Sequence, residues 1–391
     1  MNLIKKEEVI MRYVLIVPLL MNICIPLSSL AECQPERLES CRTYIAKRWE
    51  KLCKIMGKAS GLRDELPSLP PRSSWWLFSW PYRDQQSQSR KIDDLLDDAR
   101  DILLSESAKD ILTQVRRLDA KIKKINRDIA DVSKERVLHP ERKAKCDEAI
   151  RALTASRYAV RRDQLRLKRD IMIELRSWGL SVSETALEPF FSSVTCDSII
   201  DNAVVAGNIA AVVKNLGELM QCDVDNARRY YGMYLVLIDI QVRCYRDFVD
   251  KCDALWLKRV DELIYKVQYD HLVAEEGMCD SRYTGIQRDI YKKNKNLNST
   301  MLRAARLYRE CLEKQRISVV SKMASAERMR DVALNTYETI GNAIALKDLM
   351  QSSAETFDAV MKLEFPDLAA FNDAELVAEF QGITDRIMVE K

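Results

Sequence analysis

Apolar residues between Ile111 and Val132 recur at steps of four and three residues, in strict alternation. Each residue of an α-helix turns the chain by about 100°, so this spacing places one narrow apolar stripe along one face. Such a stripe is the seam through which a coiled-coil helix contacts its partner. The positions between are mostly charged, which suits the remaining surface to water. The seam residues are Ile111, Val115, Leu118, Ile122, Ile125, Ile129 and Val132.

The partner of this seam is expected in the same chain. The seam helix is predicted to run from about residue 91 to 138, where His139-Pro140 breaks it. A second helix is predicted from about 141 to 178, ending at Gly179. Two long helices joined by a tight turn fold back on each other, so the sequence predicts an antiparallel coiled-coil hairpin with arms of roughly 55–70 Å. The second seam comprises Ile150, Leu153, Val160, Leu167 and Ile171.

Proline is missing between Phe190 and Phe365, which permits very long helices because proline disrupts a helix interior. Hydrophobic residues form 47% of the chain, whereas glycine and proline, with ten each, supply too little turn chemistry for a β-rich fold. The sequence therefore predicts an all-α fold, an elongated bundle of long helices that carries the hairpin.

Five segments are expected along the chain. They are a signal peptide (1–31), an N-terminal helix followed by a Pro/Trp-rich loop (32–89), the hairpin (90–178), a long-helix bundle (179–365) and a C-terminal amphipathic helix (366–391). The N-terminal helix is predicted over Glu36–Met56, weakening at Gly57 and Gly61. Asp225–Leu272 has the broadest apolar face and is predicted to be the central helix of the bundle. A loop around Gly277–Gly285 is expected before a further long helix to about Leu363.

Ser198–Met220 is the most apolar stretch after the N-terminal segment, rich in Ile, Val, Ala and Gly over Ser198–Val213. A buried core helix is the favoured interpretation, because the small residues permit close packing and four polar residues interrupt the stretch. The alternative is an insertion segment like that of helical pore-forming toxins.

The N-terminus resembles a secretory signal. Lys5, Lys6 and Arg12 precede the short apolar run Tyr13–Leu27, and small residues at positions 29 and 31 predict cleavage after Ala31. Met11 is an alternative start, and an uncleaved anchor is the rival interpretation. The run is short for a bilayer span of about 20 residues and contains two prolines. We therefore expect an exported protein, in the bacterial periplasm or secreted.

The cysteine count leaves two interpretations open. Of eleven cysteines, ten follow the predicted signal segment, and an even count in an exported chain favours disulfides. The spacings match no small disulfide scaffold, so several cysteines could equally be small buried hydrophobic residues.

Half of the tryptophans lie in one short aromatic segment, residues 75–82. Amphipathic aromatic side chains favour a lipid–water interface or the groove of a partner. Alternatively, the segment folds back and closes the end of the helical bundle. The candidate contact residues are Trp75, Trp76, Phe78, Trp80 and Tyr82.

The sequence contains none of three common catalytic motifs. Two isolated histidines, His139 and His271, cannot form a His-Glu-x-x-His zinc site, and neither a Gly-x-Ser-x-Gly elbow nor a phosphate-binding loop occurs. We expect no enzyme, no catalytic residue, no cofactor and no metal.

The net charge of +3 gives no general attraction to nucleic acid. The basic excess of Lys134–Arg176 indicates either a solvated helix face or an anionic partner.

These observations favour a non-enzymatic exported scaffold or adaptor that acts through protein–protein contacts in the cell envelope. Its protein partner is unknown, and a homo-oligomer and peripheral membrane contact stay open. The alternative is a helical pore-forming or membrane-active protein that uses Ser198–Val213 or the aromatic segment.

Overall fold

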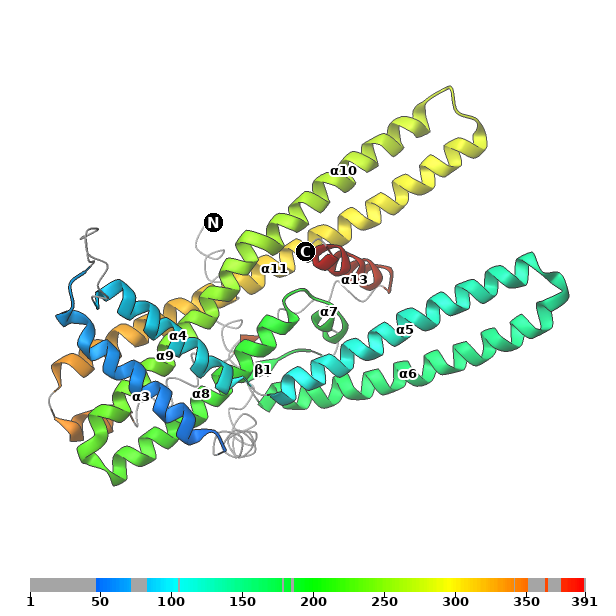
Figure 1. Cartoon of the computed structure of the whole chain (residues 1–391). Helices are drawn as coiled ribbons and strands as arrows, with labels where there is room; N and C mark the ends of the chain where they lie inside the picture. Colours follow the sequence, from blue (N-terminus) through cyan, green and yellow to red (C-terminus); the bar gives the residue numbers. More distant parts are fainter. Residues whose placement is uncertain are drawn as a thin grey trace, which may run out of the picture.

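The computed structural model describes residues 47–71, 83–104, 106–177, 179–183, 186–340, 342–350, 363–364 and 374–389. Nearly all of these residues are helical, and the helices form a body from which two long arms project (Figure 1). The all-α class and the elongated bundle are confirmed. The predicted signal segment and the aromatic segment lie outside the described residues, as do residues 36–46 of the predicted N-terminal helix.

The centre of the body is the helix α9 (Ala227–Lys251), which is buried without interruption from Tyr231 to Ile238. Because its apolar residues face several directions, α9 needs neighbours on several sides. It contacts α3 (Trp49–Glu65), α4 (Gln85–Leu103), α8 (Cys196–Cys222) and α11 (Gly285–Thr339). The central position predicted for this stretch is therefore observed.

Helix α8 contains the apolar stretch Ser198–Val213. By length and composition it is the one helix among the described residues that could cross a membrane, but 78% of its most apolar window is buried inside the protein. Even its polar Asn208 is buried, and the Asn208 side chain donates a hydrogen bond to the Leu103 carbonyl at 2.6 Å. In this structure the stretch is a core helix.

The first arm consists of α5 (Glu106–Leu138) and α6 (Lys143–Ser177), joined by a 3₁₀ turn over Pro140–Arg142. The two helices lie side by side and run in opposite directions (Figure 1). Polar contacts join them along their length, from Arg136–Asp147 at 2.8 Å near the tip to Arg157–Asn126 at 3.3 Å further down. Val115 and Ile125 of the predicted seam are buried. Leu118, Ile122, Ile129 and Val132 are half-buried, and the side chain of Ile111 is outside the described part.

The predicted single helix from 91 to 138 is wrong. Helix α4 ends at Leu103, because the backbone of Leu104 is extended, and α5 starts afresh at Glu106. The hydrogen bond from Asn208 satisfies a carbonyl in the last turn of α4, so the break is stabilised by a residue far away in the sequence. Consequently α4 belongs to the body, and the arm starts at α5.

The second arm consists of α10 (Lys258–Cys279) and the N-terminal half of α11. A π-helical turn over Cys252–Leu257 connects α9 to α10, so the helix predicted over Asp225–Leu272 continues into the arm. Ion pairs such as Lys295–Glu275 at 2.6 Å and Arg309–Asp261 at 2.6 Å join the two antiparallel helices.

Two helix ends in this arm differ from the prediction. Helix α10 continues through Gly277 to Cys279. Gly277 is a packing position rather than a helix end, because the ring of Tyr291 occupies the space that a Cβ atom would need. Helix α11 ends at Thr339 rather than near Leu363, and Ile340 has an extended backbone. Residues 343–350 are helical again.

The C-terminal helix α13 (Ala374–Val389) packs on α11 and on the short helix α7 (Leu187–Phe191). The rings of Tyr308 and Phe380 lie 4.2 Å apart, and the Tyr308 hydroxyl hydrogen-bonds Thr384 at 2.8 Å. A two-residue parallel pairing of β1 (Leu180–Ser181) with β2 (Leu363–Glu364) was not predicted.

Helix α3 also departs from the prediction, because it continues through Gly57 and Gly61 to Glu65. Gly57 faces the end of the Met233 side chain, and the Cα of Gly232 faces the hydroxyl of Ser60. Small residues therefore let α3 and α9 approach closely. Asp239 of α9 adds ion pairs to Arg63 of α3 and to Arg330 of α11, the latter at 2.6 Å.

All eight cysteines among the described residues are free thiols. Five of them are buried, as the hydrophobic interpretation expects: Cys146, Cys196, Cys244, Cys252 and Cys311.

We predict that Gly232→Ala lowers the free energy of unfolding by about 1–3 kcal/mol, because a Cβ atom would collide with the Ser60 hydroxyl. Urea denaturation followed by circular dichroism measures the change. The matched control is Gly61→Ala, an exposed helical position with open space around it, which should gain about 0.5–1 kcal/mol. Combining Gly232→Ala with Ser60→Gly should restore most of the lost free energy of unfolding. Equal changes in this free energy for Gly232→Ala and Gly61→Ala would contradict the close approach of α3 and α9.

Candidate functional site

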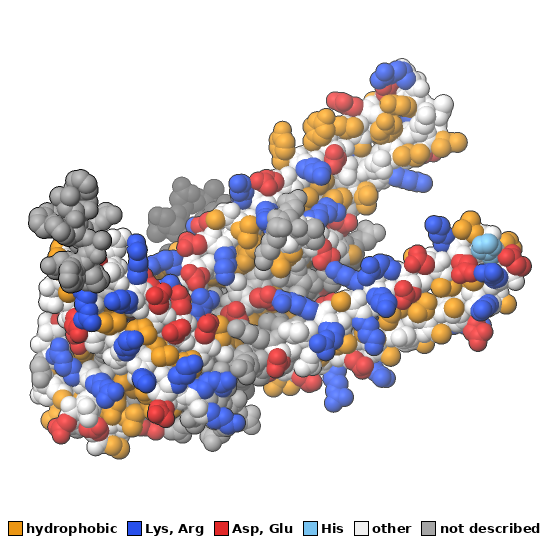
Figure 2. Space-filling view, in the orientation of Figure 1, with side chains coloured by type: hydrophobic (Ala, Val, Ile, Leu, Met, Phe, Trp, Pro, Cys, Tyr) orange, Lys and Arg blue, Asp and Glu red, His pale blue; other side chains and the backbone are white. Residues whose placement is uncertain are grey.

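The exposed large apolar side chains gather on the two arms, where Figure 2 shows orange side chains among the charged ones. On the second arm, Tyr265 is 75% exposed and Ile286 is 78% exposed. Apolar surface of this kind is unusual on a helix that has no further partner. The exposed set on the arms is Val137, Leu138, Tyr158, Leu165, Ile173, Tyr265, Tyr269, Leu272, Val273, Ile286, Ile290 and Leu297.

The exposed residues of α10 form a defined row. Tyr265, Tyr269 and Leu272 are spaced by four and three residues, so they lie on one face of the helix. The buried residues Val260, Val267 and Ala274 occupy the opposite face, which is turned toward the rest of the protein. The row therefore lies opposite the buried face of α10, where it can receive another helix, and Leu272 at its end also borders a groove shared with α11.

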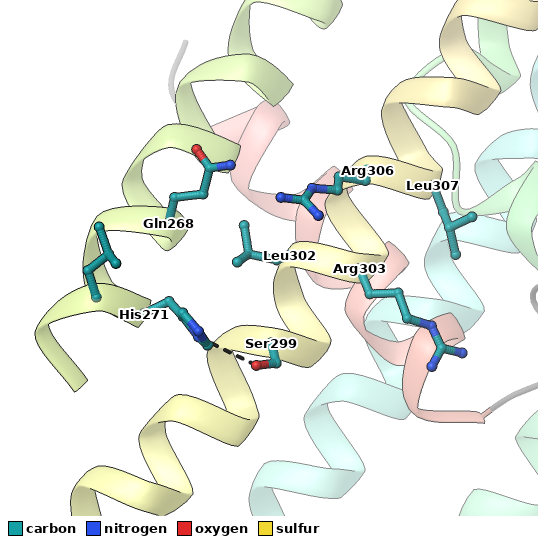
Figure 3. A pocket seen from close by; sticks show the side chains of 8 residues that line it. Gln268, His271, Ser299, Leu302, Arg303, Arg306 and Leu307 are labelled. Carbon is teal, nitrogen blue, oxygen red and sulfur yellow. Dashed lines mark hydrogen bonds between the residues drawn. The ribbon is translucent and has the colours of Figure 1, made fainter. Parts of the chain in front are cut away.

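A groove of about 790 Å³ runs along one side of the second arm (Figure 3). From α10 it is lined by Gln268, His271 and Leu272, and from α11 by Ser299, Leu302, Arg303, Arg306 and Leu307. His271 and Ser299 point toward each other across the groove, with Nδ1 and Oγ 3.4 Å apart. Arg303 and Arg306 are exposed beside them and form no ion pair with a described residue. The groove is open and positively charged, and its lining combines polar side chains with Leu272, Leu302 and Leu307.

A buried charged cluster joins the first arm to the body. The side chain of Lys168 in α6 is only 3% exposed, and its Nζ atom lies 2.7 Å from a carboxylate oxygen of Glu188 in α7. The same ammonium group lies 5.6 Å from the centre of the Phe191 ring, within range of a cation–π interaction. Asp119 of α5 accepts a hydrogen bond from Gln164 in the same region.

Two more ion pairs attach α5 to the body around a cavity of about 340 Å³. Arg116 pairs with Asp197 of α8, and Lys123 pairs with Asp385 of α13 at 2.6 Å. Helices from three parts of the chain thus meet at the base of the arm. These contacts join the arm to the body at its base.

Burial raises the pKa of Asp119, and the negative charge of Glu188 adds to the effect. The positive charge of Lys168 and the hydrogen bond from Gln164 act in the opposite sense without cancelling it. The arm base therefore places two carboxylates around one buried ammonium group.

The buried thiols of the body have little reactivity, and the two histidines lie apart. Burial raises the pKa of Cys244, Cys252 and Cys311 to about 12, so these thiols stay protonated at neutral pH. His139 lies at the tip of the first arm and His271 on the second arm, so the two cannot share a site. Among the described residues, no three His, Cys, Asp or Glu side chains lie together in a way that could hold a metal ion.

The sequence-predicted contact residues Trp75, Trp76, Phe78, Trp80 and Tyr82 all fall in 72–82, outside the described residues. Sequence reasoning missed the Lys168 cluster and the α10 row. A signal for the cluster was present, since Lys168 follows Leu167 and precedes Ile171, beside the seam of the second helix. The row could have been found as a second apolar stripe, opposite the buried one, at Tyr265, Tyr269 and Leu272.

Comparison with known proteins adds no function, since no protein-family model, curated protein or solved structure matches the chain.

We predict that Lys168→Met lowers the free energy of unfolding by about 2–4 kcal/mol, because it leaves the carboxylate of Glu188 partly buried without its cation. Methionine keeps the length that packs against Phe191. The control Lys124→Met, at an exposed position of α5, should change the value by less than about 0.5 kcal/mol. Equal effects of the two substitutions in urea denaturation would show that Lys168 is not held by the cluster.

We also predict a pH dependence for Asp119→Asn, which keeps an oxygen to accept the bond from Gln164. Because the pKa of Asp119 is raised in the folded state, ionised Asp119 reduces stability above that pKa, and the penalty disappears as the pH falls below the ordinary value of 3.8. The substitution should therefore stabilise the protein at neutral pH, and its benefit should fade on acidification. A benefit that stays constant with pH, measured by urea denaturation, would contradict this account.

Proposed function

We propose that this chain is a non-enzymatic, exported scaffold or adaptor protein whose arms contact other proteins in the cell envelope. The observation that carries the proposal is the exposed apolar row on α10, formed by Tyr265, Tyr269 and Leu272, which lies opposite the buried face of that helix.

An apolar row without a partner does not gain the free energy that burial of its side chains would release. Large apolar side chains are stabilised by about 1.5–3 kcal/mol each when they leave water. Helix α9 gains this stabilisation in the body, where its Tyr234 and Tyr245 are fully buried. On α10 two tyrosines of the same kind remain in solvent, 75% and 63% exposed. Residues at i, i+4 and i+7 are the anchors by which one helix packs along another.

The shape of the arms supports binding rather than catalysis. The groove on the second arm lies between two helices and is open to solvent, whereas small-molecule sites usually enclose most of their ligand. A projecting pair of helices with exposed apolar rows presents area to a large partner. Tyrosine supplies such area at a low cost in side-chain entropy.

The second candidate is a membrane-active protein that inserts α8. It is favoured by one observation, that α8 is long and apolar enough to span a bilayer. Insertion would require α8 to leave the core and to break the hydrogen bond between Asn208 and Leu103. Leakage of a dye from liposomes at neutral and acid pH tests this candidate, and a chain that never permeabilises the lipid removes it.

We predict that replacing Tyr265 and Tyr269 with serine lowers recovery of a protein partner at least tenfold, since two aromatic anchors are worth roughly 1.4 kcal/mol or more. The tagged chain is expressed in its own cells, cross-linked in the envelope and purified, and the co-purified proteins are quantified by mass spectrometry. The matched control replaces Ile317 and Val332, two exposed apolar residues of the body, with serine.

The control variant should recover the partner like the wild type. If the tyrosine variant recovers the same proteins in the same amounts, or if the wild type recovers none, the proposal is wrong.

A further inference from the structure

The outer face of α6 carries a row of arginines that the fold does not use. Positions spaced by three and four residues place the row on one sector, opposite the residues Val160, Gln164 and Ile171 that pack toward α5. Every member of the row is exposed. The row consists of Arg151, Ala155, Tyr158, Arg162, Leu165, Arg166, Arg169, Ile173 and Arg176.

The row is charged with one sign only. Asp163, Asp170 and Glu174 lie on other sectors of α6, so no carboxylate interrupts the row from Arg151 to Arg176. None of its five arginines forms an ion pair with a described residue. By contrast, the outer face of α5 mixes Arg117, Lys121 and Lys124 with Asp128 and Asp131. A solvated face needs no such segregation, whereas an anionic partner does.

We propose that this arginine row docks the first arm on the surface of an anionic lipid membrane. The guanidinium group binds phosphate oxygens in a bidentate manner and is weakly hydrated, which suits contact with lipid headgroups. The row is straight and about 38 Å long, so all five arginines can touch a flat surface at once.

The apolar members of the row fit the same surface. Tyr158, Leu165 and Ile173 are exposed by 66%, 38% and 69%, and they alternate with the arginines along the helix. Side chains of this type enter the boundary between headgroups and acyl chains while neighbouring cations stay at the phosphates. Nucleic acid offers the same phosphates but no apolar layer for these three residues.

The membrane proposal rests on the proposed function and assigns a different binding partner to each arm. The first arm would hold the protein on a membrane through α6, and the second arm would present the α10 row to a protein. Two separate surfaces make the two proposals separable: vesicle binding tests α6 alone, and recovery of a partner through Tyr265 and Tyr269 tests α10 alone.

The test measures binding of the purified chain, without its predicted signal segment, to vesicles of phosphatidylcholine with about 30% phosphatidylglycerol at about 0.1 M salt. We expect binding to these vesicles, none to pure phosphatidylcholine, and release at high salt. Replacing Arg162, Arg166 and Arg169 with glutamine should weaken binding on the order of a hundredfold, at roughly fivefold for each charge. Circular dichroism confirms that the variant is folded, which the exposure of these side chains leads us to expect.

The matched control replaces Arg117, Lys121 and Lys124 on the outer face of α5 with glutamine, which changes the net charge equally. This control should bind vesicles within a few-fold of the wild type. The inference is overturned if the wild type does not bind anionic vesicles, or if both variants lose binding equally. It is also overturned if a DNA duplex or polyglutamate, and not the vesicles, binds in a way that depends on the α6 arginines.

Discussion

Burial of α9 on all sides is the constraint on which the rest of this structure depends. From Tyr231 to Ile238 no side chain of the helix reaches solvent freely, so four other helices must surround it. Fully burying large side chains such as Tyr234, Tyr245 and Phe248 stabilises the fold by about 1.5–3 kcal/mol each. The close contact of Gly232 with Ser60 lets α3 complete this shell. The same apolar core continues into the bases of both arms, through residues such as Val115, Ile171 and Val260.

The two arms extend outward from this core. Each arm is a pair of helices that bury one shared face and leave the other faces in water, so the arms carry the surfaces that another molecule can reach (Figure 1). The first arm is joined to the body by apolar packing of residues such as Val115 and Ile171 and by polar contacts. Lys168 with Glu188, Arg116 with Asp197, and Lys123 with Asp385 link it to three separate helices.

Much of the fold could be predicted because local patterns determine it. The seam from Ile111 to Val132 and the break at His139-Pro140 give the helices of the first arm, and the broad apolar face after Asp225 gives the central helix. The break after Leu103 could not be predicted, because it depends on Asn208, a residue more than a hundred positions away. Gly57 and Gly277 suggested helix ends, but each lies in a helix, facing Met233 and Tyr291 respectively. The α6 arginines were visible as a basic excess, and only the fold shows that they share one unpaired face.

The most direct test of the central claim, a closed body with two projecting arms, is small-angle X-ray scattering of the chain without its predicted signal segment. Helix α11 has 55 residues and is alone about 80 Å long. We therefore predict a maximum dimension above about 80 Å and an asymmetric distance distribution with a long tail. A compact chain of this length, 391 residues less the 31 of the predicted signal segment, would have a radius of gyration of about 21 Å. A symmetric distribution with that radius would contradict the account.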